Sequence, residues 1–433
     1  FIFKMHVFLQ TLGCRLNEAE LETWARSFRG QGAQLVNSAE KADLIVLNTC
    51  AVTNESIKKS RNLIRRAKKN NPQAKIIVSG CYATLKTNEV LEELDVELVV
   101  KNSEKDRLVE ISKKIFPKES NLLENPNLTR NLENYECRHR GFIKVQDGCR
   151  YRCTYCIVTI ARGKEVSRPE KQIIQQINTL HLEGKKEVVL TGVHLGGYGS
   201  DIGTSLTSLI KKILEETNIP RIRLGSLEPW DIPKDFWILF QNSRLLPHLH
   251  LPLQSGCDSV LKRMSRRCKT KDFATLVNVG LEQVDDLSIT TDLIVGFPGE
   301  TEYEWEKTKE FVSSMEFAHA HIFTFSPHDG TKAATLQMPV DRAIKRERSR
   351  ELHEILARQK HQVLQKFKGR NFEVLFEHSS SMDSFGKKIW SGYTPNYLKV
   401  NIAMDPLLSI ENQILSITTT HVDETGEKLI ARV

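Results

Sequence analysis

The sequence predicts an α/β fold made of a flavodoxin-like parallel α/β domain, a partial TIM-like (β/α) barrel and a small C-terminal β-barrel. Three observations predict it. Apolar runs alternate with helical stretches in the first part of the chain, βα pairs repeat after residue 142, and short β-rich runs fill the last part of the 433 residues. We therefore expect domains at 4–118, 137–365 and 366–433, with a polar linker at 119–136.

The first domain begins with alternating strands and helices. The expected strands lie at 5–10, 43–48 and 75–79, and the expected helices at 17–30, 56–70 and 85–94. The strand at 43–48 is almost continuously apolar, which is typical of a strand buried on both faces. Alternation at this spacing favours a parallel, doubly wound sheet.

Three cysteines follow these three strands. Cys14, Cys50 and Cys81, called here the strand-end triad, each come within four residues of an expected strand end. The carboxyl ends of parallel strands share the edge where ligands bind, so cysteines far apart in sequence can meet there. The alternative is three unrelated buried thiols, because free cysteine is often buried. A joint site would offer three thiolates, which suits an iron–sulfur cluster with one open iron.

The second domain begins with a strand at 142–146 that leads directly into a cysteine-rich loop. A helix at 169–184 follows, with Pro169 at its first turn and Gly184 at its end. Further strands are expected at 187–191, 221–225, 248–253, 288–295 and 319–325. This repeat predicts a complete or partial barrel with catalytic loops after its strands, which places the cysteine loop at the carboxyl rim.

The cysteine loop carries the most specific pattern in the chain. Cys149, Cys153 and Cys156, called here the loop triad, have the spacing C-x3-C-x2-C. Thiolates are the usual ligands of iron–sulfur clusters, and three of them leave one iron of a four-iron cluster open. Zinc is the alternative, but a structural zinc site takes four ligands, normally as two C-x2-C-like pairs, and the sequence has no second pair of that kind. The spacing resembles the signature of the radical S-adenosylmethionine (SAM) superfamily, in which the cofactor binds the open iron.

Glycines and polar residues follow the later strands and form a candidate wall for a nucleoside-sized cofactor. Glycine at a strand end lets the backbone approach a ligand closely. For each residue alone a turn or a cap is the commoner explanation, but together they predict a SAM site. The candidates are Tyr155, Gly192, Val193, Ser226, Glu228, Gln254, Gly296 and Pro298. Three nearby histidines could be ligands, but we expect a structural role for them: His194, His248 and His250.

The last domain is expected to be a five-stranded barrel. Short β-rich runs lie at 370–376, 387–393, 398–402, 413–420 and 428–433, with turn residues between them. Residues 366–433 hold eight basic and eight acidic residues, so any contact of this domain with RNA depends on local arrangement or on other patches.

Basic residues cluster along a chain whose formal net charge is +8. Residues 56–71 hold seven basic residues and no acid, and further clusters lie at 262–271 and 342–350. Such patches are typical of proteins that bind a polyanion, and the alternative is a solvated helix face. The candidate RNA contacts are Lys58, Lys59, Arg61, Arg65 and Arg66.

The apolar runs and the cysteine usage indicate the cellular compartment of the protein. No apolar run reaches the roughly 18 residues that a membrane span needs, so we expect no membrane contact. Nine cysteines spread over a long chain are not the dense pattern of a secreted disulfide scaffold. A reducing cytoplasm suits both free thiolates and oxygen-sensitive clusters, so we expect a cytoplasmic location.

These motifs together resemble the methylthiotransferase family of radical SAM enzymes over nearly the whole chain. In the first domain the resemblance rests on TLGCRLN at 11–17, NTCAVT at 48–53 and SGC at 79–81. In the second it rests on the loop triad and on RLGSLEP at 223–229, HLPLQSG at 250–256 and VGFPGET at 295–301. The stretch GYTPNYLKV at 392–400 resembles the TRAM module.

The resemblance implies insertion of a methylthio group into a C–H bond, with SAM and two [4Fe–4S] clusters as cofactors. It implies that the loop triad holds the cluster that cleaves SAM reductively to the 5′-deoxyadenosyl radical. The strand-end triad would hold an auxiliary cluster whose open iron carries the sulfur that is methylated and transferred. The implied partners are the tRNA anticodon stem-loop and a reductant such as flavodoxin or ferredoxin, and we expect a monomer.

The residues after Cys50 bear on the substrate. The sequence AVTN at 51–54, with KKSR at 58–61, resembles members that modify C2 of N6-threonylcarbamoyladenosine at position 37 of tRNA. Members acting on isopentenyladenosine usually carry an Arg-containing sequence just after this cysteine, which is absent here. The alternatives are the same chemistry on isopentenyladenosine-37 or on an aspartate of a small-subunit ribosomal protein. An alternative of another class is a non-catalytic tRNA-binding iron–sulfur protein. Residues 327–330 (PHDG) replace an Arg-containing turn of many relatives.

Overall fold

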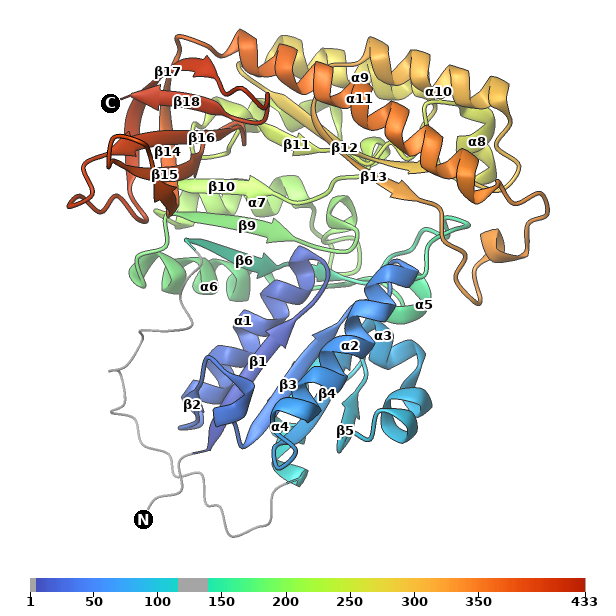
Figure 1. Ribbon diagram of the computed structural model, residues 1–433, viewed down its shortest axis with the longest axis vertical. Coiled ribbons are helices and arrows are strands. Elements are labelled where there is room, and N and C mark those ends of the chain that lie inside the picture. Colours follow the sequence, from blue (N-terminus) through green and yellow to red (C-terminus); the bar gives the residue numbers. More distant parts are fainter. Residues whose placement is uncertain (1–4, 116–138, 433) are drawn as a thin grey trace.

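The computed structural model describes residues 5–115 and 139–432. Figure 1 shows an α/β unit at the bottom in blue, a curved barrel wall above it in green to yellow, and a small barrel in red. The linker expected at 119–136 lies outside the described residues, and the domain limits expected beside it stay a prediction.

The N-terminal unit is a five-stranded parallel sheet. Its strand order is β2-β1-β3-β4-β5, the order of flavodoxin-like folds, in which ligands bind at the switch point between β1 and β3. The structure therefore confirms the predicted parallel, doubly wound sheet and adds two strands, β2 and β5, that were not expected. The strands are β1 (His6–Thr11), β2 (Gln34–Leu35), β3 (Leu44–Thr49), β4 (Lys75–Gly80) and β5 (Leu98–Val100).

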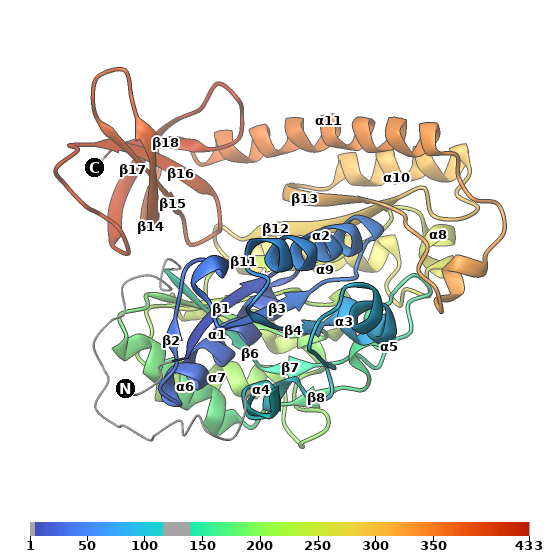
Figure 2. The same ribbon diagram turned by 60° about the horizontal axis from the view of Figure 1, so that its bottom comes forward.

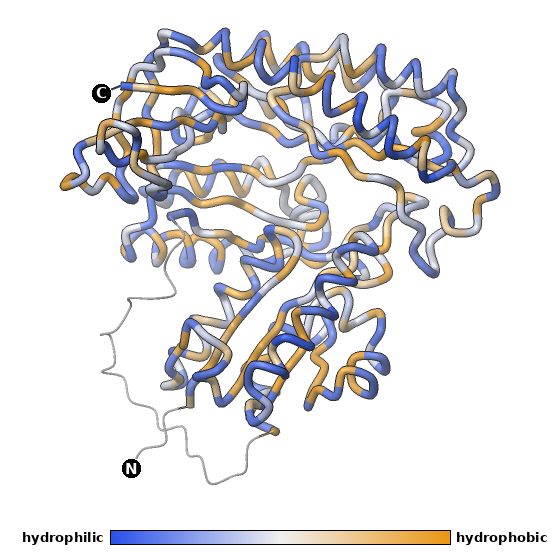
Figure 3. The backbone as a smooth tube through the Cα atoms, viewed as in Figure 1, coloured by the Kyte–Doolittle hydropathy of each residue, from blue (hydrophilic) through white to orange (hydrophobic). Residues whose placement is uncertain are grey.

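Helices cover both faces of this sheet. One face packs against apolar residues of α1 and α4, and the other against those of α2 and α3. Figure 3 shows the hydrophobic stretches running along the strands between these layers. The helical elements are α1 (Arg15–Gly30), η1 (Ala39–Lys41), α2 (Asn54–Asn70), α3 (Cys81–Leu85), η2 (Glu89–Glu93), η3 (Lys105–Arg107), α4 (Leu108–Ser112) and η4 (Lys113–Ile115).

The helix expected at 85–94 is confirmed in part, because residues 87–93 are helical, but a separate short helix that was not expected precedes them. Gly80 has a φ of +97°, which ends β4 in a sharp turn and lets α3 begin at Cys81. The α-helix ends at Leu85, and a single π-helical turn covers 89–93 instead. The hydroxyls of Thr84 and Thr87 donate back to carbonyls of the preceding turn, a local bond that competes with helix propagation.

The middle unit is a partial barrel of six parallel strands. They form two three-stranded sheets, β10-β9-β6 and β11-β12-β13, joined by parallel bridges between Ile222 and Leu245 and between Ser226 and His250. This curved wall confirms the predicted partial TIM-like barrel. The strands are β6 (Arg140–Lys144), β9 (Glu187–Thr191), β10 (Arg221–Leu224), β11 (His248–His250), β12 (Ser288–Val295) and β13 (Phe317–Thr324).

Helices and short turns surround this wall, and a two-stranded antiparallel ribbon, β7 (Gln146–Asp147) with β8 (Val166–Ser167), frames the cysteine loop. The largest apolar core of the described residues lies between these helices and the strands. The helical elements are α5 (Val158–Arg162), α6 (Glu170–Leu182), η5 (Leu195–Gly197), α7 (Leu206–Glu216), η6 (Pro229–Asp231), η7 (Lys234–Gln241), α8 (Asp258–Arg263), α9 (Thr270–Gln283), α10 (Glu302–Ser314) and η8 (Lys332–Thr335).

A long helix, α11 (Arg342–Lys366), links the partial barrel to the small one. Figures 1 and 2 both show it running beside α10 and ending at the small barrel. In the sequence its first residues stand out only as a basic cluster. Its apolar positions, Leu352, Leu356, Val363 and Leu364, are widely spaced among charged residues, yet all four are buried.

The C-terminal unit is a closed five-stranded barrel, as predicted. Its order is β14-β15-β16-β18-β17, and only the β16–β18 pair is parallel. Buried Glu187 holds Arg221 and Arg223 at 2.8 Å, and these arginines donate to the carbonyls of Glu373 and Pro395 in this unit. The strands are β14 (Asn371–Met382), β15 (Lys388–Tyr393), β16 (Lys399–Met404), β17 (Ile414–Val422) and β18 (Leu429–Arg432).

No helix in the described part of the chain is long and apolar enough to cross a membrane.

Candidate functional site

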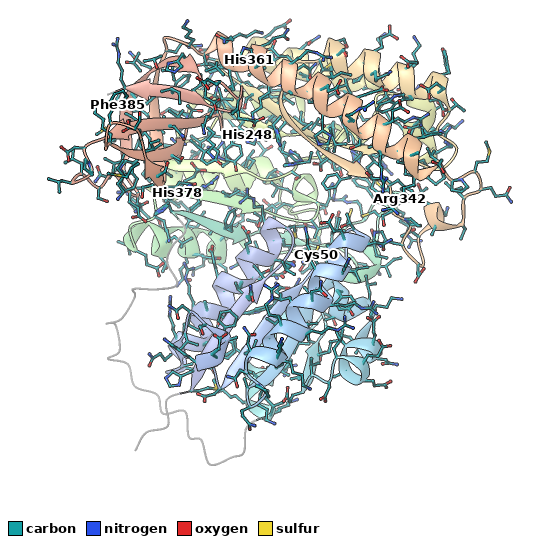
Figure 4. The ribbon with its side chains drawn as sticks, in the orientation of Figure 1. Cys50, His248, Arg342, His361, His378 and Phe385 are labelled. Carbon is teal, nitrogen blue, oxygen red and sulfur yellow. The ribbon has the colours of Figure 1, made fainter. Side chains whose placement is uncertain are left out.

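The strand-end triad converges on one cavity. Cys14 caps the start of α1 after β1, Cys50 follows β3 directly, and Cys81 is the first residue of α3 after β4. All three line a cavity of about 1230 Å³ between the N-terminal unit and the two barrels. Gly13, at a φ of +112°, passes so close that a Cβ there would lie 2.9 Å from the Cys50 Sγ. Figure 4 shows Cys50 at the end of the N-terminal unit that faces the partial barrel.

The thiols of this triad are electrostatically coupled. Cys14 is exposed at the cavity wall, yet the surrounding protein desolvates its thiol and raises the pKa of Cys14; Arg162 opposes that rise, and Cys81 and Cys50 add to it. Burial likewise raises the pKa of Cys50, with a further rise caused by Cys81. The thiols of Cys14 and Cys50 therefore need an added positive charge to stay deprotonated together, which is what a metal centre provides.

Arg162 brings a positive charge from the partial barrel into the N-terminal unit. It is the last residue of α5 and its side chain is 1% exposed. Its guanidinium donates to Glu20 at 2.9 Å, to Asp147 at 3.0 Å and to Asn17 Oδ1 at 2.7 Å. Buried Lys105 pairs with the same two carboxylates. This network fixes the helix after the cysteine loop against the strand-end triad.

A second contact joins the same helix to Cys81. The Asn102 side chain donates to the carbonyl of Ala161 at 2.9 Å and lies 3.8 Å from the Cys81 Sγ. On the other side of the site, the ring of His328 bonds to the carbonyl of Val52 at 2.9 Å. The PHDG turn that departs from the expected Arg-containing sequence thus contacts the loop that carries Cys50.

The loop triad is held by hydrogen bonds within its own part of the chain and by bonds to the end of α8. The Cys149 N–H donates to Gly163 O at 3.2 Å, the Cys156 N–H donates to Cys153 O at 3.0 Å, and the Thr154 hydroxyl donates to Arg263 O at 2.9 Å. Burial raises the pKa of Cys149 to about 12 and that of Cys156 to about 11, with mutual repulsion among the thiolates as a further cause. This set of thiols therefore also needs a positively charged group to ionise together.

Arg266 supplies a buried charge beside the loop triad. Its guanidinium lies 3.9 Å from the Cys153 Sγ, pairs with Glu228 at 2.7 Å and stacks 4.4 Å from the Trp230 ring centroid. Nothing in the residue spacing indicated this contact, because Arg266 lies far from the loop in sequence and was counted only as part of a basic cluster.

The three histidines, for which we expect structural roles, all bond to protein groups, and His248 and His250 also line the large cavity, so their structural role stays a prediction. His194 is 1% exposed and sits between the carboxylates of Glu165 and Asp231. Burial alone would lower its pKa, but the hydrogen bonds that the ring donates to both carboxylates outweigh burial and raise the pKa. His248 and His250 both bond to the Thr290 hydroxyl at 3.0 Å.

The structure divides the candidate SAM residues into two groups. Gly192, Val193 and Ser226 line the large cavity. The other candidates do not line it and lie around the loop triad or inside the rim turns: Tyr155, Glu228, Gln254, Gly296 and Pro298. Among these, Glu228 is engaged by Arg266, and Gln254 has a φ of +78° at the end of a rim strand. The assignment of all eight to SAM stays a prediction.

The candidate RNA residues lie on α2, next to the strand-end triad. Lys58, Lys59, Arg65 and Arg66 are exposed. Arg61 instead pairs with Glu89 and donates to the Tyr82 hydroxyl at 3.1 Å, so its charge is already compensated. In the other two basic clusters the structure also forms buried or half-buried ion pairs, namely Arg263–Glu304, Arg266–Glu228 and Arg348–Glu300.

Two family models and several named tRNA-modifying proteins match this chain. Residues 6–101 match the uncharacterized protein family UPF0004, and residues 143–312 match the radical SAM superfamily. A Thermotoga maritima protein named threonylcarbamoyladenosine tRNA methylthiotransferase MtaB is 37% identical over 397 residues, 90% of each chain. The Bacillus subtilis protein of the same name is 33% identical over 91% of this chain and 89% of that protein. A Bacillus velezensis protein named tRNA-2-methylthio-N(6)-dimethylallyladenosine synthase is 33% identical over 91% of this chain and 80% of that protein.

Solved structures show the same fold. The radical SAM methyltransferase TsrM from Kitasatospora setae, with cobalamin and a [4Fe–4S] cluster bound, superposes with a TM-score of 0.59 over 77% of each chain. The identity is 13%, so this likeness concerns the fold alone.

Proposed function

The chain belongs to the methylthiotransferase family of radical SAM enzymes, and on that premise we propose that it modifies C2 of N6-threonylcarbamoyladenosine-37 in tRNA. It is a transferase that uses SAM and a [4Fe–4S] cluster, as the family implies. The net change would replace the C2–H bond by a C2–SCH3 bond. The hydrogen atom would pass to the 5′-deoxyadenosyl radical formed from one SAM, the sulfur would come from the auxiliary cluster, and the methyl group would come from a second SAM. The named activity of the two relatives at 33–37% identity supports this choice of nucleoside.

We further propose that the chain binds two clusters, one at each triad. The observation that carries this proposal is the convergence of Cys14, Cys50 and Cys81 on a cavity that rim residues of the partial barrel also line. A cluster at the loop triad would supply the radical by reductive cleavage of SAM, and a cluster at the strand-end triad would supply the sulfur. The thiols fit such groups, because burial and mutual repulsion disfavour three thiolates at either place without added positive charge.

The chain's own residues would hold and orient the reactants. The loop triad sits on a ribbon-framed loop tied to Gly163 and Arg263, and Arg266 places a positive charge beside Cys153. Arg162 and Asn102 fix α5 against the strand-end triad, so the two thiol sets keep a constant separation. A low-potential donor of the flavodoxin or ferredoxin class would supply the electrons.

Anaerobic reconstitution tests the two-cluster proposal. We expect about eight irons per chain and formation of 5′-deoxyadenosine under reduction. About four irons per chain would contradict the second cluster. Mass spectrometry of nucleosides from tRNA treated with the enzyme should show the 2-methylthio derivative of threonylcarbamoyladenosine.

A second candidate substrate is isopentenyladenosine-37, because a relative named for the dimethylallyl nucleoside is also 33% identical to this chain. Parallel assays on stem-loops that carry either nucleoside separate the two. Thiolation of the isopentenyl substrate alone would overturn the proposed nucleoside while leaving the chemistry intact.

We propose that α2 contacts the tRNA backbone. This helix begins four residues after Cys50, which lines the cavity, and it carries the exposed Lys58, Arg65 and Arg66. Lys59 is also exposed and pairs with Glu55 at 2.7 Å. Replacing Arg65 and Arg66 together by Gln should weaken binding of every stem-loop alike. The slope of log Kd against log salt concentration should fall by about one unit for each arginine that no longer reaches a phosphate. A salt dependence equal to that of the wild-type protein would contradict this surface.

A further inference from the structure

Arg15 stands beside the strand-end triad with little to compensate its charge. It directly follows Cys14 at the first turn of α1 and lines the same cavity. Its side chain is 53% exposed, and the acidic group near it, Glu18, is 3.7 Å away, which is longer than a hydrogen bond. The guanidinium therefore has a loose ion pair with Glu18 but no hydrogen bond to a carboxylate among the described residues.

Other cations of this cavity wall are already engaged. Arg140 pairs with Glu377 at 2.6 Å, Arg223 with Glu187 at 2.8 Å, and Arg162 with Glu20 at 2.9 Å. Lys360 pairs with Glu427. Lys428 has only a loose ion pair, 3.9 Å from Asp423, as Arg15 has with Glu18, but it lies in the turn before β18 of the small barrel. Lys399 has no ion pair among the described residues, but it belongs to β16 of the small barrel rather than to the triad's own loop.

Aromatic and phenolic groups hold Arg15 in place. Its Nη2 donates to the Tyr397 hydroxyl at 3.2 Å, and its guanidinium lies 5.1 Å from the Phe142 ring centroid. Tyr397 also accepts from Arg140 at 3.2 Å, which fixes the phenol. An arginine positioned by stacking and one hydrogen bond keeps its remaining N–H donors for a ligand, and its planar fork matches a carboxylate.

The proposed substrate carries such a carboxylate. In N6-threonylcarbamoyladenosine the threonyl carboxylate is attached through N6, and C6 and C2 flank N1 on one edge of the base. When C2 faces the strand-end triad, the N6 substituent lies along the same edge, near the residues that adjoin the triad. The isopentenyl group has no charge and offers nothing for an arginine to bind.

We propose that Arg15 is a specificity-determining residue that binds the threonyl carboxylate of the substrate. This inference rests on the proposed function. It assigns recognition of the N6 substituent to Arg15, whereas the proposed contacts with the phosphate backbone are made by α2.

The test compares two anticodon stem-loops that differ only in this group, one with the threonyl carboxylate and one with its neutral carboxamide. Holoenzyme binding is measured anaerobically without SAM, and the readout is the ratio of the two Kd values. We expect the wild-type protein to favour the acid by about ten- to a hundredfold, the range of a charge-assisted hydrogen bond. Arg15→Gln should bring this ratio close to one.

A matched control lies on the same helix. Arg29, in the last turn of α1, does not line the cavity, so Arg29→Gln removes the same charge and should keep the wild-type ratio. Arg15→Lys should retain part of the preference, and Tyr397→Phe, which removes the phenol that positions Arg15, should reduce it less than Arg15→Gln does. These two variants decide the question if Arg15→Gln fails to fold or to retain iron.

The outcomes separate the two proposals. A wild-type enzyme that does not thiolate the threonylcarbamoyl stem-loop overturns the proposed function and this inference together. A wild-type enzyme that does thiolate it, with an acid preference unchanged by Arg15→Gln and Arg15→Lys, overturns the inference alone. Loss of the preference in Lys399→Gln but not in the Arg15 variants would place the carboxylate on β16 and would also overturn it.

Discussion

The two cysteine triads are built in opposite ways. The loop triad lies in one short loop between β7 and α5 and is shaped by hydrogen bonds inside and around that loop. The strand-end triad is assembled from three strand ends of a parallel sheet and depends on Arg162 and Asn102, which connect that sheet to the partial barrel. A local motif can specify the first site, whereas the second exists only when two units of the protein are packed together.

This difference predicts separable roles for the two triads. Cys153→Ala removes a thiolate of the loop triad and should abolish formation of 5′-deoxyadenosine from SAM. Cys50→Ala removes a thiolate of the strand-end triad and should stop thiolation while some SAM cleavage remains. Both are measured by chromatography of SAM products and mass spectrometry of tRNA nucleosides, with iron content falling from about eight to about four per chain.

Two results would contradict separate roles for the two triads. Methylthio product from the Cys50→Ala enzyme would show that the strand-end triad does not serve sulfur delivery. Loss of SAM cleavage in Cys50→Ala with full retention of iron would show that the two triads act as one site.

The junction between the two triads should be more sensitive to substitution than the segments that carry the cysteines. Arg162→Met removes a guanidinium from buried Glu20 and partly buried Asp147, both of which keep Lys105 as a partner, and this should lower the free energy of unfolding by about 1–3 kcal/mol. We expect this variant to lose iron from the strand-end triad first. Urea unfolding and iron analysis measure the two effects.

Arg26 offers a matched control for that change. It also joins α1 to the partial barrel, through Glu183 at 3.1 Å, but this pair is half-exposed. Arg26→Met should therefore cost about 0–1 kcal/mol and leave the iron content unchanged. Equal losses of stability and iron in both variants would mean that the buried Arg162 network contributes no more than the half-exposed Arg26 pair.

Acid should weaken the junction between the two triads. Burial alone would raise the pKa of Glu20, but Arg162 and Lys105 outweigh burial and hold the pKa below its usual value. A depressed pKa contributes stability in full above the ordinary carboxyl pKa of about 4.3 and loses it as the pH falls towards the folded value. Glu20→Gln should lower stability at pH 7 and flatten its decline between about pH 5 and 3. Urea midpoints across that range measure the change, and an unaltered slope would contradict it.

Much of this fold could be predicted because buried strands are short, apolar and regularly spaced. The strand at 43–48 and its partners indicated a parallel sheet, and that topology alone brought Cys14, Cys50 and Cys81 to one edge. The two-residue strand β2 and the helix α11 were missed, since one is too short for a pattern and the other has few apolar positions for its length.

The charged residues around the triads could not be predicted in the same way. Arg162 and Arg266 reach their partners through packing between elements that are distant in sequence, and nothing marks their charges out in a chain with 62 basic residues. Periodicity indicates which face of an element is buried, but it carries no information on which opposite charge that face will meet.

The smallest expected effect tests whether the start of α2 supports the strand-end triad. Thr53 caps this helix, three residues after Cys50, accepting from the Ser56 N–H at 3.1 Å while the Ser56 hydroxyl accepts from the Thr53 N–H at 2.9 Å. Thr53→Ala should cost about 1 kcal/mol of unfolding free energy. It should also speed iron loss to a chelator, because the loop that carries Cys50 would be less restrained.

Thr301 provides the comparison, since it forms the same kind of capping box with Glu304 at the start of α10. Thr301→Ala should cost a similar free energy without changing the rate of iron loss, because α10 contributes no residue to either triad. If both variants release iron at the same rate, global stability rather than the local cap controls the strand-end site. If only Thr53→Ala does, the site assembled from distant strands depends on local order at each strand end as well as on the packing that joins them.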